Sequence, residues 1–263
     1  MRGYSATAFV TMTLLGEAVL AQRFTGNLAD DLLGVALALT AAIAGIKLLG
    51  RLPKNRTVRR VFTFGKTVAG VYTLWIFARW AADTLLDSAS TVLPFITFGA
   101  VALALGLSGR EKVIKAALVL APITVVFLLL IFGFSLPFME VKYLIPYKAP
   151  TLSGVGRAFL SSFLPLAGAI LPIAESFSGK FGGGKGLALG SALLGLTFID
   201  TLAVFGSEYA VTLTHPFALA VTTASVGELF SRCDPLLYAV GFFTCLIRAA
   251  ACFGPSLGRR RVN

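Results

Sequence analysis

The sequence predicts an all-α integral membrane protein: a single membrane domain over residues 1–263 with about nine transmembrane helices. The first observation is composition: 57% of the residues are hydrophobic and 13% are charged, about half the charged share of a soluble domain. The second is a mean hydropathy of +0.86, which implies more apolar surface than a water-soluble chain of this length can bury. The third is that apolar runs of roughly 20 residues, long enough to cross a bilayer, recur along the chain. These observations exclude an ordinary soluble enzyme, a disordered chain and a fibrous repeat.

The apolar runs give nine candidate spans. Those at 31–50 and 112–134 are unambiguous, whereas those at 153–176 and 213–231 contain several polar, glycine and proline residues. The longest connection, 135–152, contains prolines and tyrosines, and aromatic residues are typical of the membrane interface. It separates a first repeat-like half, 1–134, from a second half, 153–253. The predicted spans are 4–22, 31–50, 61–86, 90–108, 112–134, 153–176, 184–206, 213–231 and 234–253.

The first segment, 4–22, allows two interpretations. Arg2 precedes it and Val19-Leu20-Ala21 resembles a small-residue cleavage site, the pattern of a secretory signal peptide. Glu17 just upstream of that site, together with the many later spans, favours a retained first helix.

Basic residues gather in alternate connections and predict the orientation. The connections at 51–60, 110–115 and 180–185 are rich in Lys and Arg and are expected on the cytoplasmic side, which places the N-terminus inside. The net charge of +11 is therefore attributed to topology, and no nucleic-acid partner is expected. Nine spans would place Arg259, Arg260 and Arg261 outside. A re-entrant segment, a missing tenth span or a tail on the unusual side would each account for this.

Two acidic residues fall well inside predicted spans, where a charge costs on the order of 2.5–3.5 kcal/mol and usually faces a cavity or another helix. Glu17 lies beside Gly16, which can leave backbone groups free, so Glu17 is a candidate for lining a ligand cavity. Asp200 lies deep in 184–206 and is a candidate coupling residue. A polar contact between helices is the alternative interpretation of Asp200.

Charges nearer the ends of spans have simpler interpretations. Arg79 and Asp83 are four residues apart, share a helix face and can pair. Because they lie near the outer end of their helix, a pair at the membrane interface is favoured. Arg248, in the last span, can also extend to the interface.

The segment 153–176 contains Pro165 and Pro172 with Gly168 between them. Each proline removes a backbone donor and clashes with the preceding turn, which predicts a discontinuous helix, with a continuous helix as the alternative. Transporters place substrates at such breaks. Gly16 and Gly168 lie five spans apart, as corresponding breaks in a five-plus-five inverted repeat would. The candidate ligand-binding residues are Gly16, Glu17, Ala167 and Gly168.

No residue pattern supports catalysis. The chain has one histidine and three cysteines without metal-ligand spacing, so no catalytic residue, metal or cofactor is expected. The glycine-rich stretch 179–186 lacks the residue order of a phosphate-binding loop and is interpreted as a flexible cytoplasmic connection.

Three elements within 201–234 suggest a family. They are Ala203-Val204-Phe205-Gly206, then His215-Pro216, then Gly227-Glu228-Leu229-Phe230-Ser231-Arg232-Cys233-Asp234. Together they resemble the B subunit of bacterial spore germinant receptors, which belongs to the amino acid/polyamine/organocation permease superfamily. In that family an aromatic residue usually stands where this chain has His215. The resemblance covers about 35 residues closely, roughly one span and its flanks, and the remaining chain loosely.

The resemblance implies a five-plus-five inverted-repeat permease fold, here lacking the last helix, in the bacterial cytoplasmic or spore inner membrane. It implies a small nutrient such as an amino acid as ligand, membrane lipid around the chain, and A and C receptor subunits as partners. Asp200, Glu228 and Arg232 are the candidate coupling or gating residues. Glu228 and Arg232 are four residues apart on one helix face, so a structural pair is an equal alternative to a gate. The family often has a Gly-Glu pair in its sixth span, where this chain has Ala167-Gly168.

Three functions remain open from the sequence. The first is a germinant-receptor subunit that senses an amino acid or a similar nutrient. The second is a proton- or cation-coupled transporter of amino acids, in which Glu17 or Asp200 would carry the proton. The third is a scaffold that binds no ligand.

Overall fold

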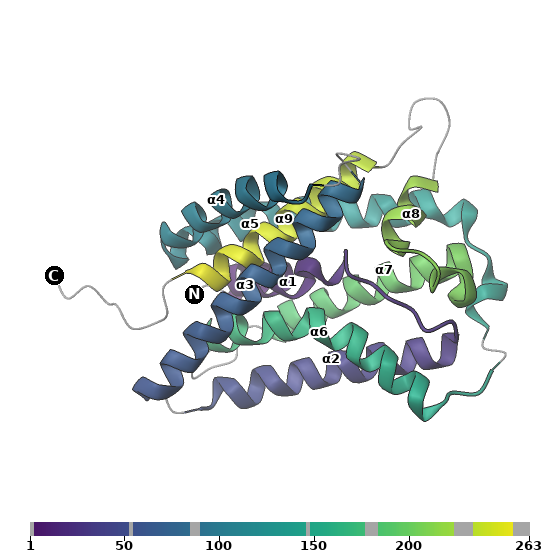
Figure 1. Cartoon of the computed structure of the whole chain (residues 1–263), viewed down its shortest axis with the longest axis horizontal. Helices are drawn as coiled ribbons and strands as arrows, with labels where there is room; N and C mark the ends of the chain where they lie inside the picture. The colour runs from purple at the N-terminus through teal and green to yellow at the C-terminus, as the bar shows by residue number, and fades with distance from the viewer. Residues whose placement is uncertain are drawn as a thin grey trace.

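The computed structural model describes residues 3–52, 55–84, 90–145, 148–176, 184–223 and 234–254. Within these ranges every regular element is a helix, and the long helices form one bundle (Figure 1). In chain order the helices are α1 (Gly3–Leu15), η1 (Gly16–Ala18), α2 (Leu28–Gly50), α3 (Arg56–Thr84), α4 (Val92–Leu107), α5 (Arg110–Ser135), η2 (Leu136–Phe138), η3 (Val141–Leu144), α6 (Leu152–Ser176), α7 (Gly184–Ala210), α8 (Pro216–Thr223) and α9 (Asp234–Phe253).

The prediction of an all-α membrane protein is confirmed. In the part of the chain that the structure describes, six helices are long and apolar enough to cross a membrane: α2, α3, α5 with η2, α6, α7 and α9. Helix α4 is shorter, with 16 residues, and α1 has 13. The described part of the segment predicted at 213–231 is the eight-residue α8, and residues 224–231 lie outside the described ranges. Nine membrane crossings therefore remain a prediction.

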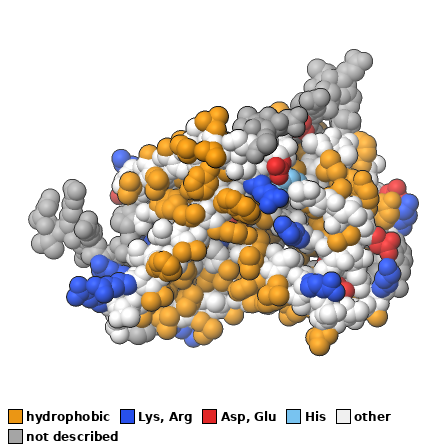
Figure 2. Space-filling view, viewed as in Figure 1, with side chains coloured by type: hydrophobic (Ala, Val, Ile, Leu, Met, Phe, Trp, Pro, Cys, Tyr) orange, Lys and Arg blue, Asp and Glu red, His pale blue; other side chains and the backbone are white. Residues whose placement is uncertain are grey.

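Small residues allow the helices to approach closely. A side chain at Gly34 in α2 would lie 2.3 Å from Cβ of Ala158 in α6, and a side chain at Gly186 in α7 would lie 2.6 Å from the carbonyl of Thr7 in α1. Because lipid tails are as apolar as the helix surfaces, close van der Waals packing rather than the hydrophobic effect holds helices together in a membrane. Large apolar side chains instead cover the outside, and Figure 2 shows them over the middle of the visible face.

The two ends of the bundle are defined by contacts of α3 with α8 and α9. Near the beginning of α3, Nζ of Lys66 donates a hydrogen bond of 3.3 Å to the carbonyl of Gly254, just after α9. At the end of α3, the carbonyl of Thr84 accepts a hydrogen bond of 3.1 Å from Tyr238 in the first turns of α9. Nε2 of His215, just before α8, lies 3.1 Å from Asp83 at the same end. Helices α3 and α9 are therefore antiparallel.

The contacts of α9 also show at which end of the bundle the basic connections begin and end. Helix α9 ends beside the α4–α5 connection, because a side chain at Gly106 would meet the carbonyl of Ala250 at 2.8 Å. The end of α2, the beginning of α3, the end of α6 and the beginning of α7 lie at the same end in Figure 1. Helix α8 lies at the opposite end of the bundle, where α9 begins. A segment that does not cross the membrane would lie at one end in this way. This favours the re-entrant interpretation of the span count.

The end opposite the basic connections is held by two buried carboxylates. Asp30 and Asp31 lie in the first turn of α2. Asp31 accepts hydrogen bonds from the backbone N–H of Thr25 at 2.8 Å and from the hydroxyl of Ser207 in α7 at 2.6 Å. Asp30 accepts one of 2.7 Å from the backbone N–H of Thr151, just before α6. These bonds fix the starts of α2 and α6 beside the end of α7.

Candidate functional site

Helix α1 stops inside the bundle. It ends at Leu15, and Gly16 follows with a φ of +33°, a conformation that side-chain-bearing L-residues rarely adopt. One short turn, η1, leads into a non-helical connection to α2. The interruption that the sequence suggested at Gly16 is confirmed. It places Glu17 on irregular backbone within the protein, where such backbone is tolerated only if its surroundings satisfy it.

Glu17 forms a buried ion pair with Arg248 of α9. Oε1 of Glu17 lies 2.8 Å from Nη2 of Arg248, and both side chains are 0% exposed. The other carboxylate oxygen, Oε2, accepts a hydrogen bond of 2.9 Å from the hydroxyl of Thr73 in α3. The interpretation that Arg248 extends to the membrane interface is wrong, because its partner Glu17 lies in the interior of the bundle.

Arg248 also connects this ion pair to α6. Its Nη2 donates a hydrogen bond to the carbonyl of Pro165. A side chain at Gly16 would lie 2.3 Å from Cδ of Arg248, and one at Gly168 would lie 2.4 Å from Nη2. Three of the four predicted ligand-binding residues, Gly16, Glu17 and Gly168, are thus brought together around Arg248. We call Gly16, Glu17, Thr73, Gly168 and Arg248 the central cluster.

Ala167, the fourth predicted ligand-binding residue, packs half-buried against the hydrophobic core. The predicted break in α6 is wrong. The helix runs without interruption from Leu152 to Ser176 and contains both Pro165 and Pro172. Each proline removes one backbone donor and crowds the preceding turn, but α6 stays a single helix while it packs along α2. The second non-helical position lies in α7 instead, at Gly206, where φ is +71° and ψ is 158°.

The central cluster is incompletely hydrogen-bonded. Among the described residues, Nε and Nη1 of Arg248 are buried without a hydrogen-bond partner, and Oε1 of Glu17 accepts no well-aligned hydrogen bond although it is close to Nη2. Removing two charges from water costs several kcal/mol per ion, and excellent geometry is needed to offset it. A contribution to stability therefore does not explain this buried, imperfectly bonded ion pair, and charged residues inside a membrane protein are usually functional.

A cleft adjoins the central cluster. It has a volume of ≈ 450 Å³ and lies between the α1–α2 connection, α3, α6 and the segment before α8. Pro165 of α6 forms part of its wall, and the carbonyl of the same residue accepts a hydrogen bond from Arg248. Pro165 therefore connects the cleft to the central cluster. We call it the cationic cleft because its lining includes the guanidinium groups of Arg23 and Arg79; His215 also lines it.

The cationic cleft also has aromatic and apolar walls. Tyr72 and Trp75 of α3 line it together with Leu160 and Leu164 of α6. Arg79 stacks over the ring of Trp75, with its guanidinium carbon 5.6 Å from the ring centroid. A cavity with apolar walls and a few polar groups at fixed places is the usual form of a small-molecule site.

The predicted pair of Arg79 and Asp83 is confirmed, and its location at the membrane interface stays a prediction. The two side chains lie 3.9 Å apart and are about half exposed. Asp83 also contacts His215, so this carboxylate links the end of α3 to the start of α8. Arg23 has no ion-pair partner within the described parts of the chain. The charge of the cleft lining is therefore positive.

The predicted coupling and gating residues are separate from the central cluster. Asp200 in α7 is buried, and its Oδ2 accepts a hydrogen bond of 3.4 Å from Ser135 of α5. This is the polar contact between helices that the sequence left as the alternative. Its Oδ1 has no hydrogen-bond partner. Glu228 and Arg232 lie outside the described residues.

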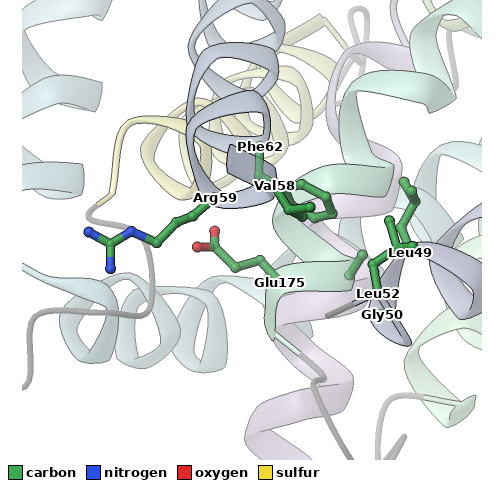
Figure 3. Close-up of a pocket in the computed structure, with 8 residues that line it drawn as sticks. Leu49, Gly50, Leu52, Val58, Arg59, Phe62 and Glu175 are labelled. Carbon is green, nitrogen blue, oxygen red and sulfur yellow. The ribbon is translucent and has the colours of Figure 1, made fainter. Parts of the chain in front are cut away.

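A second buried ion pair was not foreseen from the sequence. Lys66 of α3, which is 2% exposed, lies 2.5 Å from Glu175 near the end of α6. A small pocket of ≈ 90 Å³ adjoins Glu175, and Figure 3 shows the apolar side chains of the α2 end on one side of it. The same view shows Arg59 and Glu175 on the other side. The signal in the sequence was a single lysine in the apolar run 61–86.

The cysteines and metal-ligating residues form no chemical centre in the described ranges. Cys245 and Cys252 are buried in α9, consistent with packing residues, and Cys233 lies outside the described residues. Among the described residues, no group of three or more His, Cys, Asp or Glu side chains is placed to hold a metal ion. No protein-family model and no curated protein matches the chain.

Proposed function

We propose that the chain is a membrane receptor subunit that binds an amino acid or a similar small carboxylate nutrient in a permease-like cavity. The observation that carries the proposal is the central cluster: a helix interrupted at Gly16 and a buried Glu17–Arg248 pair tied to the cationic cleft through Pro165. The resemblance of 201–234 to germinant-receptor B subunits supports a sensing role. On that resemblance, the partners are A and C subunits in a bacterial spore inner membrane.

The chemistry of the cationic cleft supports a small carboxylate as ligand. Arg23 offers a guanidinium that forms no ion pair with an acid in the described ranges, and arginine binds carboxylates through two parallel hydrogen bonds. Tyr72 and Trp75 offer apolar and aromatic surface to the remainder of the ligand. A cavity of ≈ 450 Å³ is in the range of small-molecule sites.

The central cluster gives the ligand a route to the rest of the chain. A ligand in the cationic cleft contacts the α6 turn at Pro165 and moves the carbonyl that Arg248 binds. Arg248 belongs to α9, and its partner Glu17 follows α1. Occupancy of the cleft therefore changes the relative positions of α6, α9 and the end of α1. A partner subunit that contacts any of these helices senses the change.

The second candidate function is a proton-coupled transporter of amino acids. Asp200 favours it, since this carboxylate is buried with only one weak hydrogen bond and can exchange a proton. Purified chain in lipid vesicles then accumulates an amino acid when a proton gradient is imposed. Absence of accumulation across an amino-acid panel, with binding retained, supports the receptor. An Asp200→Asn variant separates the two, because it abolishes proton-driven uptake and leaves binding intact.

The functional experiment is a germination assay in the spore-forming host. The gene is deleted together with other receptor genes, and purified spores are followed by their fall in optical density on an amino-acid panel. The intact gene restores the response to one nutrient class. A Leu164→Trp variant, which fills the cationic cleft, fails to restore it. The matched control is Leu129→Trp on the outer face of α5, where the leucine is 52% exposed and lines no part of the cleft.

Two results would overturn the receptor proposal. One is a normal response of spores that lack this gene and every paralogue. The other is full restoration by the Leu164→Trp variant, which would place any ligand site elsewhere.

A further inference from the structure

The Arg248 side chain fills the space that the interruption of α1 opens. Its aliphatic part lies against Gly16, since a side chain there would come within 2.3 Å of Cδ. Its guanidinium lies against Gly168, where a side chain would come within 2.4 Å of Nη2. Both positions are glycine, and only glycine leaves room for the arginine. The gap between the end of α1 and the middle of α6 is therefore occupied by a fixed positive charge.

The groups around this charge are those that would bind a free cation. The guanidinium contacts a carboxylate oxygen of Glu17 and the backbone carbonyl of Pro165. Carboxylate and carbonyl oxygens are the ligands of hard cations. In transporters with interrupted helices, exposed carbonyls and helix ends near mid-membrane coordinate sodium ions or protons. Here a side chain of the same polypeptide takes these oxygens.

We propose that Arg248 serves as a tethered cation in the central cluster and replaces a dissociable coupling ion, so that the centre requires no alkali-metal ion. This goes beyond the proposed function, because it concerns the cation that the centre needs whatever ligand the cleft takes.

Charge balance supports the assignment. Glu17 contributes one negative charge, Arg248 one positive charge, and Thr73 satisfies the remaining carboxylate oxygen. A sodium ion added to this arrangement would leave an uncompensated positive charge in a buried site, which is expensive. The Arg248→Ala variant has the opposite imbalance, because it leaves the Glu17 carboxylate without a counter-charge beside an open space, and it removes the side-chain donor from the carbonyl of Pro165. That variant is expected to bind a cation from solution.

The experiment measures the Tm of the purified full-length chain in detergent, without any nutrient. The salts are sodium chloride, choline chloride and methylguanidinium chloride at equal ionic strength. The Tm of the unmodified chain is expected to be equal in sodium and choline. Arg248→Ala has a lower Tm in choline, and sodium or methylguanidinium raises it. The expected rise is roughly 3–6 °C at a cation concentration about ten times its Kd.

Two further variants keep the test decisive. The double variant Glu17→Gln/Arg248→Ala has no carboxylate to bind a cation, so its Tm is expected to be independent of the salt. Arg248→Lys keeps a tethered charge and is expected to be as insensitive to sodium as the unmodified chain, which provides a readout if Arg248→Ala does not fold. Sodium bound to each variant, measured with the radioactive ion, is the second readout.

Specific stabilisation of the unmodified chain by sodium would overturn the proposal, as would a sodium requirement in Arg248→Lys. A folded Arg248→Ala variant that responds to neither cation would overturn it as well. This test is independent of the proposed receptor function. A chain that binds no nutrient would contradict the receptor proposal but could still show every salt response expected here.

Discussion

Removing one partner of the Glu17–Arg248 pair should destabilise the chain strongly. The variant Glu17→Gln keeps the size of the side chain and removes its charge. In the folded chain the two charges lie 2.8 Å apart and both side chains are fully buried. With an effective dielectric constant of about 20, their attraction at this distance is about 6 kcal/mol. Glu17→Gln forfeits it and leaves the guanidinium buried without a counter-charge, so we expect a loss of about 3–5 kcal/mol.

The double variant Glu17→Gln/Arg248→Met provides the control. Replacing a buried ion pair by uncharged groups of similar volume is often close to neutral, because the desolvation cost of both ions disappears. The loss in free energy of unfolding of the double variant should therefore be smaller than the sum of the two single-variant losses, by at least about 3 kcal/mol. Arg248→Met alone should lose about as much as Glu17→Gln, since it leaves the carboxylate unpaired.

The assay is reversible unfolding in mixed detergent micelles, followed by tryptophan fluorescence. Trp80 of α3 is buried and reports loss of packing in the core. The free energies of unfolding of the unmodified chain, both single variants and the double variant complete a double-mutant cycle. Losses below about 1 kcal/mol for both single variants, or strictly additive losses, would refute the conclusion that the pair forms inside the protein.

The remaining predictions concern the other buried contacts. Lys66→Met should destabilise the chain, by less than Glu17→Gln, because its partner Glu175 is 13% exposed and regains some hydration; the same unfolding assay measures the difference, and equal losses would contradict it. Gly34→Ala should cost about 1–3 kcal/mol, because the added Cβ would lie 2.3 Å from Cβ of Ala158 and push α2 from α6. The control Gly156→Ala meets nothing within 4 Å, so it should be neutral or stabilise α6 by up to about 1 kcal/mol. A Gly34→Ala variant as stable as that control would show that the helices are not in close contact.

The positions of the helices could be predicted from the sequence because apolar length is a local property. Each predicted span contains a helix, and the extent of 31–50 differs from that of α2 by only a few residues at its start. The sequence was less informative about which helices cross the membrane. The number of crossings depends on where α8 lies relative to α3, and the Asp83–His215 contact that fixes it joins residues far apart in the chain.

The site was predicted in part for a similar reason. Gly16 and Glu17 could be found because a glycine beside a buried acid is unusual in a span. The continuity of α6 could not be found, since it depends on packing along α2 rather than on Pro165 and Pro172 themselves. The partner of Arg248 could not be predicted, because the sequence alone does not show that Glu17 and Arg248 meet.

The most direct test of the central claim is ligand binding to the purified chain in lipid nanodiscs. The Tm is measured with each standard amino acid for the unmodified chain, for Leu164→Trp and for the control Leu129→Trp. We predict that one class of amino acid raises the Tm of the unmodified chain and of the control, and leaves that of Leu164→Trp unchanged. A panel in which no amino acid raises any Tm, or one that raises all three equally, would contradict a nutrient site in the cationic cleft.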